Sequence, residues 1–124
     1  MPSKYYEPGK VIGKFKPGQG MLIGYEKKHS VKYGTGSAAV KSHITATTKT
    51  KGGKGFDGQS RAIDHFHVTI EDGQGKLGQF NHGVSNGSIG AGKWGGNGRD
   101  IPDDMMKQLE AIDADHKKTM EKLV

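Results

Sequence analysis

Two short histidine-containing patterns are the residues whose types and spacing could do chemistry. His43-Ile-Thr45 and His67-Val-Thr69 each place an imidazole two positions before a hydroxyl. In an extended strand, residues two apart lie on one face, so each pattern would present both groups together, and His65 would join His67. Two such pairs facing each other could bracket a phosphodiester, with one imidazole removing a proton from a 2′-hydroxyl and the other protonating the leaving oxygen. The hydroxyls would hold the phosphoryl oxygens. The candidate catalytic residues are therefore His43, His65, His67, Thr45 and Thr69.

The paired patterns resemble the twin motif of the two-histidine phosphoesterases. The likeness covers His43-Ile-Thr-Ala46 and His67-Val-Thr-Ile70. It implies acid–base cleavage of a phosphodiester by the two histidines. In that family the motifs usually sit much further apart, in a larger duplicated domain, whereas 24 positions separate His43 from His67 here.

His65-Phe-His67 has an alternative interpretation as part of a metal site. The two imidazoles would lie roughly 6.5–7 Å apart along a strand, which lets both reach one divalent ion if a third ligand arrives. The residues that could supply that ligand are His29, His43, His82 and, if the strand twists, Asp64. Cysteine is absent and carboxylates are few near this stretch. We therefore favour a polar sheet face and expect no cofactor.

The charge distribution points to an anionic partner. The chain has a net charge of +6; residues 1–99 hold fifteen Lys and Arg against six Asp and Glu, whereas residues 100–124 hold four against seven. A basic body suits nucleic acid, although it is also typical of a well-solvated surface. The candidate nucleic-acid-binding residues are Lys49, Lys51, Lys54, Lys93 and Trp94. There are two alternatives. The lysines could protect an exposed edge strand from pairing with other chains, and Trp94 could anchor a loop to the core.

One apparent phosphate-binding motif can be excluded. The segment from Gly87 to Lys93 matches G-x-x-x-x-G-K, but Trp94 follows where a Ser or Thr would hold magnesium. Four residues, Gly-Gly-Asn-Gly, come next, so no helix N-terminus is available to complete the phosphate site. The sequence therefore does not predict a nucleoside triphosphatase.

Alternation of apolar and polar residues predicts a sheet-rich body over residues 10–82. The expected strands are Lys10–Phe15, Met21–Tyr25, His29–Tyr33, Ser42–Lys51, Ala62–Glu71 and Lys76–His82, with a turn at 26–28. On the strand from Ala62 to Glu71, the side chains of Phe66, Val68 and Ile70 should face the core. The hairpin turn at 72–75 is strongly indicated by its Asp-Gly pair.

The C-terminal quarter predicts a glycine-rich segment and then a helix. Residues 83–99 should form an irregular coil because of their glycine content. Residues 100–124 should form an amphipathic helix with Pro102 in its first turn. Its apolar stripe comprises Met105, Leu109, Ile112, His116, Met120 and Leu123. With residues 1–9 as an arm, the chain is expected to be one α+β domain: a small, strongly curved antiparallel sheet of five to six short strands with glycine-rich loops and one C-terminal helix.

The sequence favours a small basic protein that binds or acts on nucleic acid, RNA or DNA, through histidine acid–base chemistry, as a metal-independent ribonuclease of the toxin type does. The alternative is a structural or assembly protein, such as a virion component, that forms homo-oligomers and carries a His-x-His metal site at a subunit interface. No membrane partner is expected, since no apolar run is long enough to span a bilayer. The N-terminus has no signal-peptide core, so we expect a cytoplasmic protein, or one delivered or assembled without a classical signal.

Overall fold

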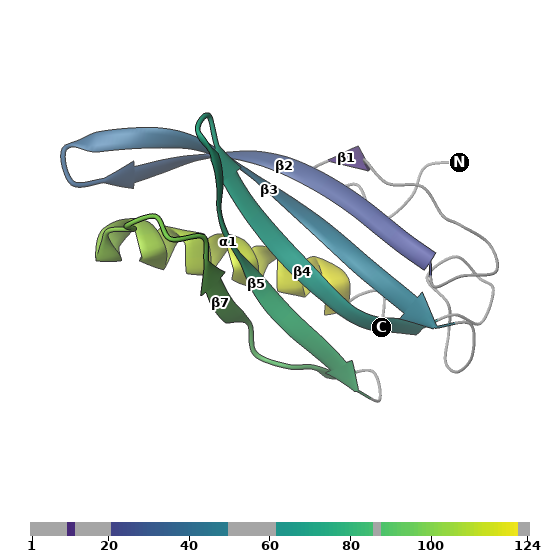
Figure 1. The fold of residues 1–124 in the computed structure, drawn as a ribbon. Coiled ribbons are helices and arrows are strands. Elements are labelled where there is room, and N and C mark those ends of the chain that lie inside the picture. The colour runs from purple at the N-terminus through teal and green to yellow at the C-terminus, as the bar shows by residue number, and fades with distance from the viewer. Residues whose placement is uncertain (1–9, 12–20, 50–61, 86–87, 122–124) are drawn as a thin grey trace.

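The structure is a computed structural model that describes residues 10–11, 21–49, 62–85 and 88–121 (Figure 1). These residues form seven strands and one helix in an α+β arrangement, as predicted. The elements are β1 (Lys10–Val11), β2 (Met21–Tyr33), β3 (Gly36–Lys49), β4 (Ala62–Asp72), β5 (Gly75–Ser85), β6 (Ser88–Ile89), β7 (Lys93–Gly96) and α1 (Asp103–Glu121).

Every strand pairing is antiparallel, and the long strands follow one another as a meander. The order is β1-β2-β3-β4-β5-β6, and β7 pairs with β5. The turn predicted at residues 26–28 is wrong, because β2 runs without interruption from Met21 to Tyr33 and pairs with β3 along its whole length. Three charged residues in a row there do not bend the chain, since Glu26 and Lys28 lie on the polar outer face of a strand that tertiary pairing holds straight.

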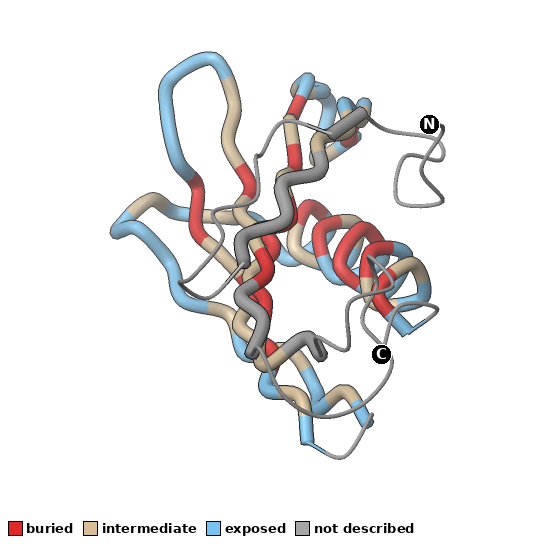
Figure 2. The backbone as a smooth tube through the Cα atoms, turned by 90° about the vertical axis from the view of Figure 1, so that its right-hand side faces the viewer, coloured by how far each residue is buried: buried red, intermediate tan, exposed pale blue. Residues whose placement is uncertain are grey.

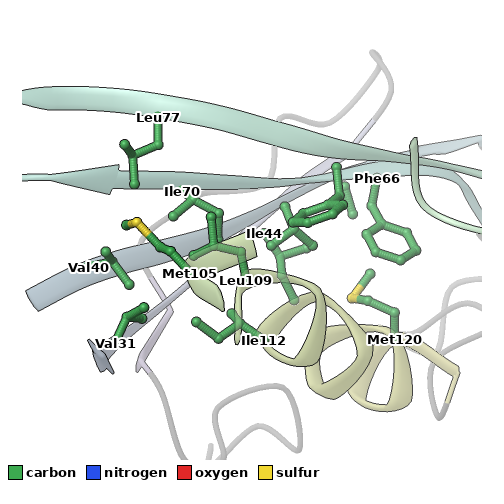
Figure 3. Close-up of a cluster of buried hydrophobic side chains, with 13 residues drawn as sticks. Val31, Val40, Ile44, Phe66, Ile70, Leu77, Met105, Leu109, Ile112 and Met120 are labelled. Carbon is green, nitrogen blue, oxygen red and sulfur yellow. The ribbon is translucent and has the colours of Figure 1, made fainter. Parts of the chain in front are cut away.

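The sheet curls around α1, and the core fills the space between them (Figure 2). The predicted core faces are confirmed, because Phe66, Val68 and Ile70 are fully buried, as are Ile44 and Ala46 on β3. In Figure 3 the side chains of Ile44, Phe66 and Ile70 lie on the side of the sheet that faces α1, in one cluster with the apolar side chains of the helix. All members of the predicted stripe that the structure describes are buried, namely Met105, Leu109, Ile112, His116 and Met120. Leu123 lies outside the described residues.

The glycine-rich segment predicted as coil contains strand structure. β5 extends to Ser85, β6 follows, and β7 pairs with β5 in the register Phe80↔Trp94 and Asn81↔Lys93. The glycines serve close packing here. A Cβ on Gly78 would stand 2.4 Å from the Trp94 ring and 2.6 Å from the Gly95 carbonyl oxygen. Strand propensity is context-dependent, so neighbouring backbone groups can recruit a glycine-rich segment into a sheet.

The helix is also tied to the β2–β3 hairpin by polar contacts. The Gln108 amide nitrogen donates to the Lys32 carbonyl oxygen, and its Oε1 accepts from the Lys32 backbone N–H at 2.8 Å. The amide thus takes the place of a neighbouring strand at that position of the β2 edge. No helix in the described part of the chain combines the length and apolar character needed to cross a membrane.

Candidate active site

The strand register brings the two histidine–threonine patterns together on the outer face of the sheet. β3 and β4 pair so that His43 stands opposite Thr69, and Thr45 stands opposite His67. Directly opposed Cβ atoms lie about 4.5–5.5 Å apart, and diagonal neighbours are about 7–8 Å apart. The four side chains therefore form one block, the histidine–threonine block, with the imidazoles on one diagonal and the hydroxyls on the other. All four residues are partly exposed.

His67 is held by a chain of side-chain hydrogen bonds. The Lys76 ammonium at the far end of this chain determines which atoms donate and which accept. The Lys76 ammonium donates to Gln79 Oε1 at 3.0 Å, and Gln79 Nε2 donates to Asn81 Oδ1 at 2.9 Å. The His67 Nδ1 atom contacts that same Asn81 oxygen. An ammonium group can only donate and an amide oxygen can only accept, so the neutral His67 carries its proton on Nδ1. Its Nε2 then bears a lone pair, and it has no hydrogen-bond partner among the described residues.

His43 lies between two carboxylates. Its Nε2 is 3.3 Å from Glu71 Oε2 and its Nδ1 is 3.8 Å from Glu26 Oε2. Lys41 Nζ lies 3.7 Å from Glu26 and 3.4 Å from Glu71, so one ammonium group lies close to both carboxylates. The hydrogen bond from His43 lowers the pKa of Glu71, with Lys41 adding to the effect. A neutral imidazole that donates to Glu71 would turn its lone pair toward Glu26. His43 Nδ1 is buried and forms no hydrogen bond to a described residue.

The two histidines of the block thus sit in different electrostatic surroundings. Neutral amide groups hold His67, whereas carboxylates flank His43. A general base needs an accessible lone pair, whereas a general acid needs an N–H that can be donated. His67 Nε2 is suited to remove a proton, and His43 is suited to supply one.

His65 does not join a metal site in the described structure. Its ring lies edge-on to that of His67, with centroids 5.3 Å apart, and its Nδ1 is 3.5 Å from Asp64 Oδ2. Within the described ranges, no three His, Cys, Asp or Glu side chains gather closely enough to hold a metal ion. His82, one of the possible third ligands, faces the helix on the opposite side of the sheet, where it is buried.

The predicted nucleic-acid-binding residues have separate locations. Lys93 is exposed and stands opposite Asn81, which in turn stands opposite His67. Lys93 therefore lies in line with one side of the histidine–threonine block, two strands away on β7. Trp94 instead packs on Phe80, with ring centroids 4.7 Å apart, and adjoins the core. The Trp94 ring therefore makes the contacts expected of a side chain that anchors this segment to the core. Lys51 and Lys54 lie outside the described residues, and only the backbone placement of Lys49 at the end of β3 is described.

A second group of titratable residues is buried between the sheet and α1, and the sequence pattern did not reveal it. His82 Nε2 lies 2.7 Å from Asp113 Oδ1, and its Nδ1 lies 2.8 Å from the Gly90 carbonyl oxygen. Burial is the largest single influence and opposes protonation of His82, but the hydrogen bonds to Asp113 and to the Gly90 carbonyl, with the charge of Asp113, together outweigh it and raise the pKa of His82. Both partners only accept, so His82 donates from both nitrogens. A Cβ on Gly92 would meet this pair at 2.6–2.7 Å, so that position requires glycine.

His116 and His29 meet at Ser42 on the same inner face. Ser42 Oγ is 2.6 Å from His116 Nε2 and 2.9 Å from His29 Nε2. Burial lowers the pKa of His116 to about 4, and burial with the nearby Lys27 charge lowers that of His29. Ser42 and His116 are fully buried, so a substrate cannot reach the hydroxyl between the two rings. The only signal in the sequence was the position of His116 on the apolar stripe.

Comparisons with protein-family models, with curated proteins and with solved structures found no match to this chain.

Proposed function

We propose that this protein binds nucleic acid on the outer face of its sheet and cleaves RNA there without a metal ion. The observation that carries the proposal is the register of β3 and β4, which sets His43 opposite Thr69 and His67 opposite Thr45. That arrangement supplies two imidazoles and two hydroxyls on one partly exposed surface, with Lys41 and Lys93 at its borders.

In the proposed reaction, His67 Nε2 takes the proton of a 2′-hydroxyl. The 2′-oxygen attacks phosphorus, the bond from phosphorus to the 5′-oxygen breaks, and a proton from His43 passes to that oxygen. The products are a 2′,3′-cyclic phosphate and a 5′-hydroxyl end. Thr45 and Thr69 donate to the phosphoryl oxygens as negative charge develops on them. The Glu71 carboxylate is about one-third exposed, which leaves it room to turn away from His43 when the phosphate enters.

The test is cleavage of end-labelled RNA by the purified protein with and without EDTA. We expect cleavage that survives chelation and that gives cyclic phosphate ends. His67→Ala and His43→Ala should each reduce kcat/KM by about 10²–10⁴-fold, because acid and base act in one transition state. His65→Ala is the matched control, since it removes an imidazole from the same face outside the block. Cleavage that requires a divalent ion, or an equal loss in all three variants, would contradict the proposal.

Binding can be measured separately from cleavage. Affinity of the His67→Ala variant for RNA should fall steeply as salt rises, because neutralising several phosphates releases counterions. Lys93→Ala should reduce the slope of log affinity against log salt concentration by about one, because one phosphate contact is lost. No binding even at low ionic strength would remove the electrostatic basis of the proposal.

The second candidate function is assembly into a homo-oligomer. It is favoured by the sheet edges, since β1 pairs with only two residues of β2 and β7 pairs only with β5 among the described strands. An exposed edge can pair with another chain. Sedimentation equilibrium decides this, because assembly predicts a concentration-dependent mass, whereas the RNA-cleaving reading is compatible with a monomer.

A further inference from the structure

The two long hairpins separate just beyond the histidine–threonine block and leave a hollow between them. β3 pairs with β4 only as far as Lys41↔Glu71, yet β3 continues with β2 to the end of its own hairpin. In Figure 1 the β2–β3 hairpin extends away from the turn between β4 and β5. The hollow has a volume of about 360 Å³ and is lined by Lys28, Ala39, Val40, Lys41, Glu71, Asp72 and Gly73. We call it the fork.

The fork shares residues with the surroundings of His43. Lys41 and Glu71 line the hollow, and Glu71 contacts His43 Nε2 at 3.3 Å. Lys41 and His43 are two positions apart on β3, which corresponds to roughly 6.5–7 Å along the strand. A group in the fork would therefore lie next to the histidine that protonates the leaving oxygen.

The polar lining of the fork has one unengaged group, and it is a donor. Both oxygens of Asp72 accept from Arg99, at 2.9 and 2.8 Å. Both oxygens of Glu71 are already in contact with nitrogen donors, Oε1 with the Lys41 ammonium and Oε2 with His43 Nε2. Lys28 is exposed and has no ion-pair or hydrogen-bond partner among the described residues. The remaining lining is small or apolar, as at Ala39 and Gly73.

We propose that the fork binds the nucleobase on the 3′ side of the scissile phosphate and prefers guanine. The inference rests on the proposed function, which places the leaving 5′-oxygen at His43. Ala39 and Gly73 line the fork and project little bulk, which leaves space for a flat ring. Lysine pairs with the O6 and N7 acceptors of guanine, whereas the corresponding edge of adenine carries an amino donor at position 6 that an ammonium group cannot accept.

A binding experiment tests the fork without requiring catalysis. Guanosine 5′-monophosphate and adenosine 5′-monophosphate are titrated into the His67→Ala protein while backbone amide signals are recorded by NMR. We expect guanosine monophosphate to shift the amides of Ala39 and Gly73 and to bind about tenfold more tightly than the adenosine nucleotide. Lys28→Ala should abolish that difference, whereas Lys32→Ala, an exposed lysine further along the same strand, should preserve it. Shifts located elsewhere, or equal affinities, would overturn the proposal.

A kinetic experiment separates failure of the fork from failure of the proposed function. The dinucleotides UpG and UpA are compared as substrates of the wild-type protein. Preference for UpG of about tenfold in kcat/KM, lost in Lys28→Ala, supports the fork. Equal cleavage of both overturns the fork and leaves the proposed function intact. Guanosine binding at Ala39 and Gly73 without any cleavage of RNA supports the fork as a nucleotide site and overturns the acid–base role of the block.

Discussion

Asn81 stands opposite His67 on the neighbouring strand, and its side-chain oxygen determines which nitrogen of the imidazole carries the proton. The same oxygen accepts from Gln79, whose own oxygen accepts from the Lys76 ammonium. Because an ammonium group cannot accept, the orientation of both amides follows from Lys76. Three residues outside the histidine–threonine block thus leave the lone pair of neutral His67 on Nε2.

This relationship predicts the neutral tautomer of His67. Nitrogen-15 NMR at a pH where His67 is neutral should find the proton on Nδ1, and Asn81→Ala should relax that preference because the acceptor is gone. His65, which has no contact with Asn81, is the internal control. If RNA is cleaved, Asn81→Ala should reduce kcat by up to about 10²-fold through loss of alignment. A His67 proton found on Nε2 in the wild-type protein would contradict the assignment.

Acid should destabilise the protein through His116. Its pKa is about 4 in the folded state against 6.5 for an ordinary histidine, because burial disfavours its charged form. The unfolded chain binds a proton below pH 6.5 that the folded chain refuses until about pH 4, so stability is present above pH 6.5 and is lost as pH falls through that range. The loss corresponds to about 3 kcal/mol.

Urea unfolding between pH 7 and pH 4 measures this loss. The His116→Gln variant should be less stable at pH 7 but should lose about 3 kcal/mol less than the wild type over the range. His65→Gln, at a more exposed histidine, should follow the wild-type pH dependence. Parallel curves for the wild type and His116→Gln would refute a neutral buried His116.

The pair of His82 and Asp113 should show the opposite dependence on pH. The folded pKa of His82 is raised, so the contribution of its charged form is fully present below pH 6.5 and is lost as pH rises through the folded value. Asp113→Ala leaves a buried imidazole without its carboxylate and should cost about 3–5 kcal/mol near pH 6. The cost should become smaller as pH rises through the folded pKa of His82, where the charged form is lost.

Asp115→Ala is the control for that experiment. Asp115 lies on the same helix, but its side chain is half exposed and its partner Lys27 is 3.5 Å away. An exposed ion pair of this kind contributes about 0–1 kcal/mol. Equal losses for the two variants, or a loss for Asp113→Ala that does not vary with pH, would show that the buried pair is not ionised.

The C-terminal helix should be required for the fold rather than appended to it. Leu109 is fully buried, and in Figure 3 it lies among the core side chains between α1 and the sheet. Leu109→Ala should reduce the free energy of unfolding by about 2–5 kcal/mol, because it removes buried apolar contact and leaves a cavity. Glu110→Ala, at the adjacent exposed position, should change it by less than about 0.5 kcal/mol. Thermal or urea unfolding of the monomer measures both, and similar small effects would indicate that the stripe is buried only in an oligomer.

The period-two alternation of the strands determined much of the fold from sequence alone. Alternation places Phe66, Val68 and Ile70 on one face of β4 and His65, His67 and Thr69 on the other, whatever the partners are. The four-and-three spacing from Met105 to Met120 similarly determined the buried side of α1. These features depend on local backbone geometry and on hydrophobicity, and both can be read from short stretches of the sequence.

The tertiary structure alone decided which of these residues meet. The 24 positions between His43 and His67 do not say whether β3 and β4 are neighbours, and a shift of register by one residue would have moved one pattern to the opposite face. The same dependence on pairing explains the errors in the glycine-rich segment and at 26–28, where local propensity pointed to coil and turn. It also explains why the partners of His82 and His116 were not foreseen. Asp113 and Ser42 reach them from distant elements, and only packing of the helix against the curved sheet brings such groups within hydrogen-bonding distance.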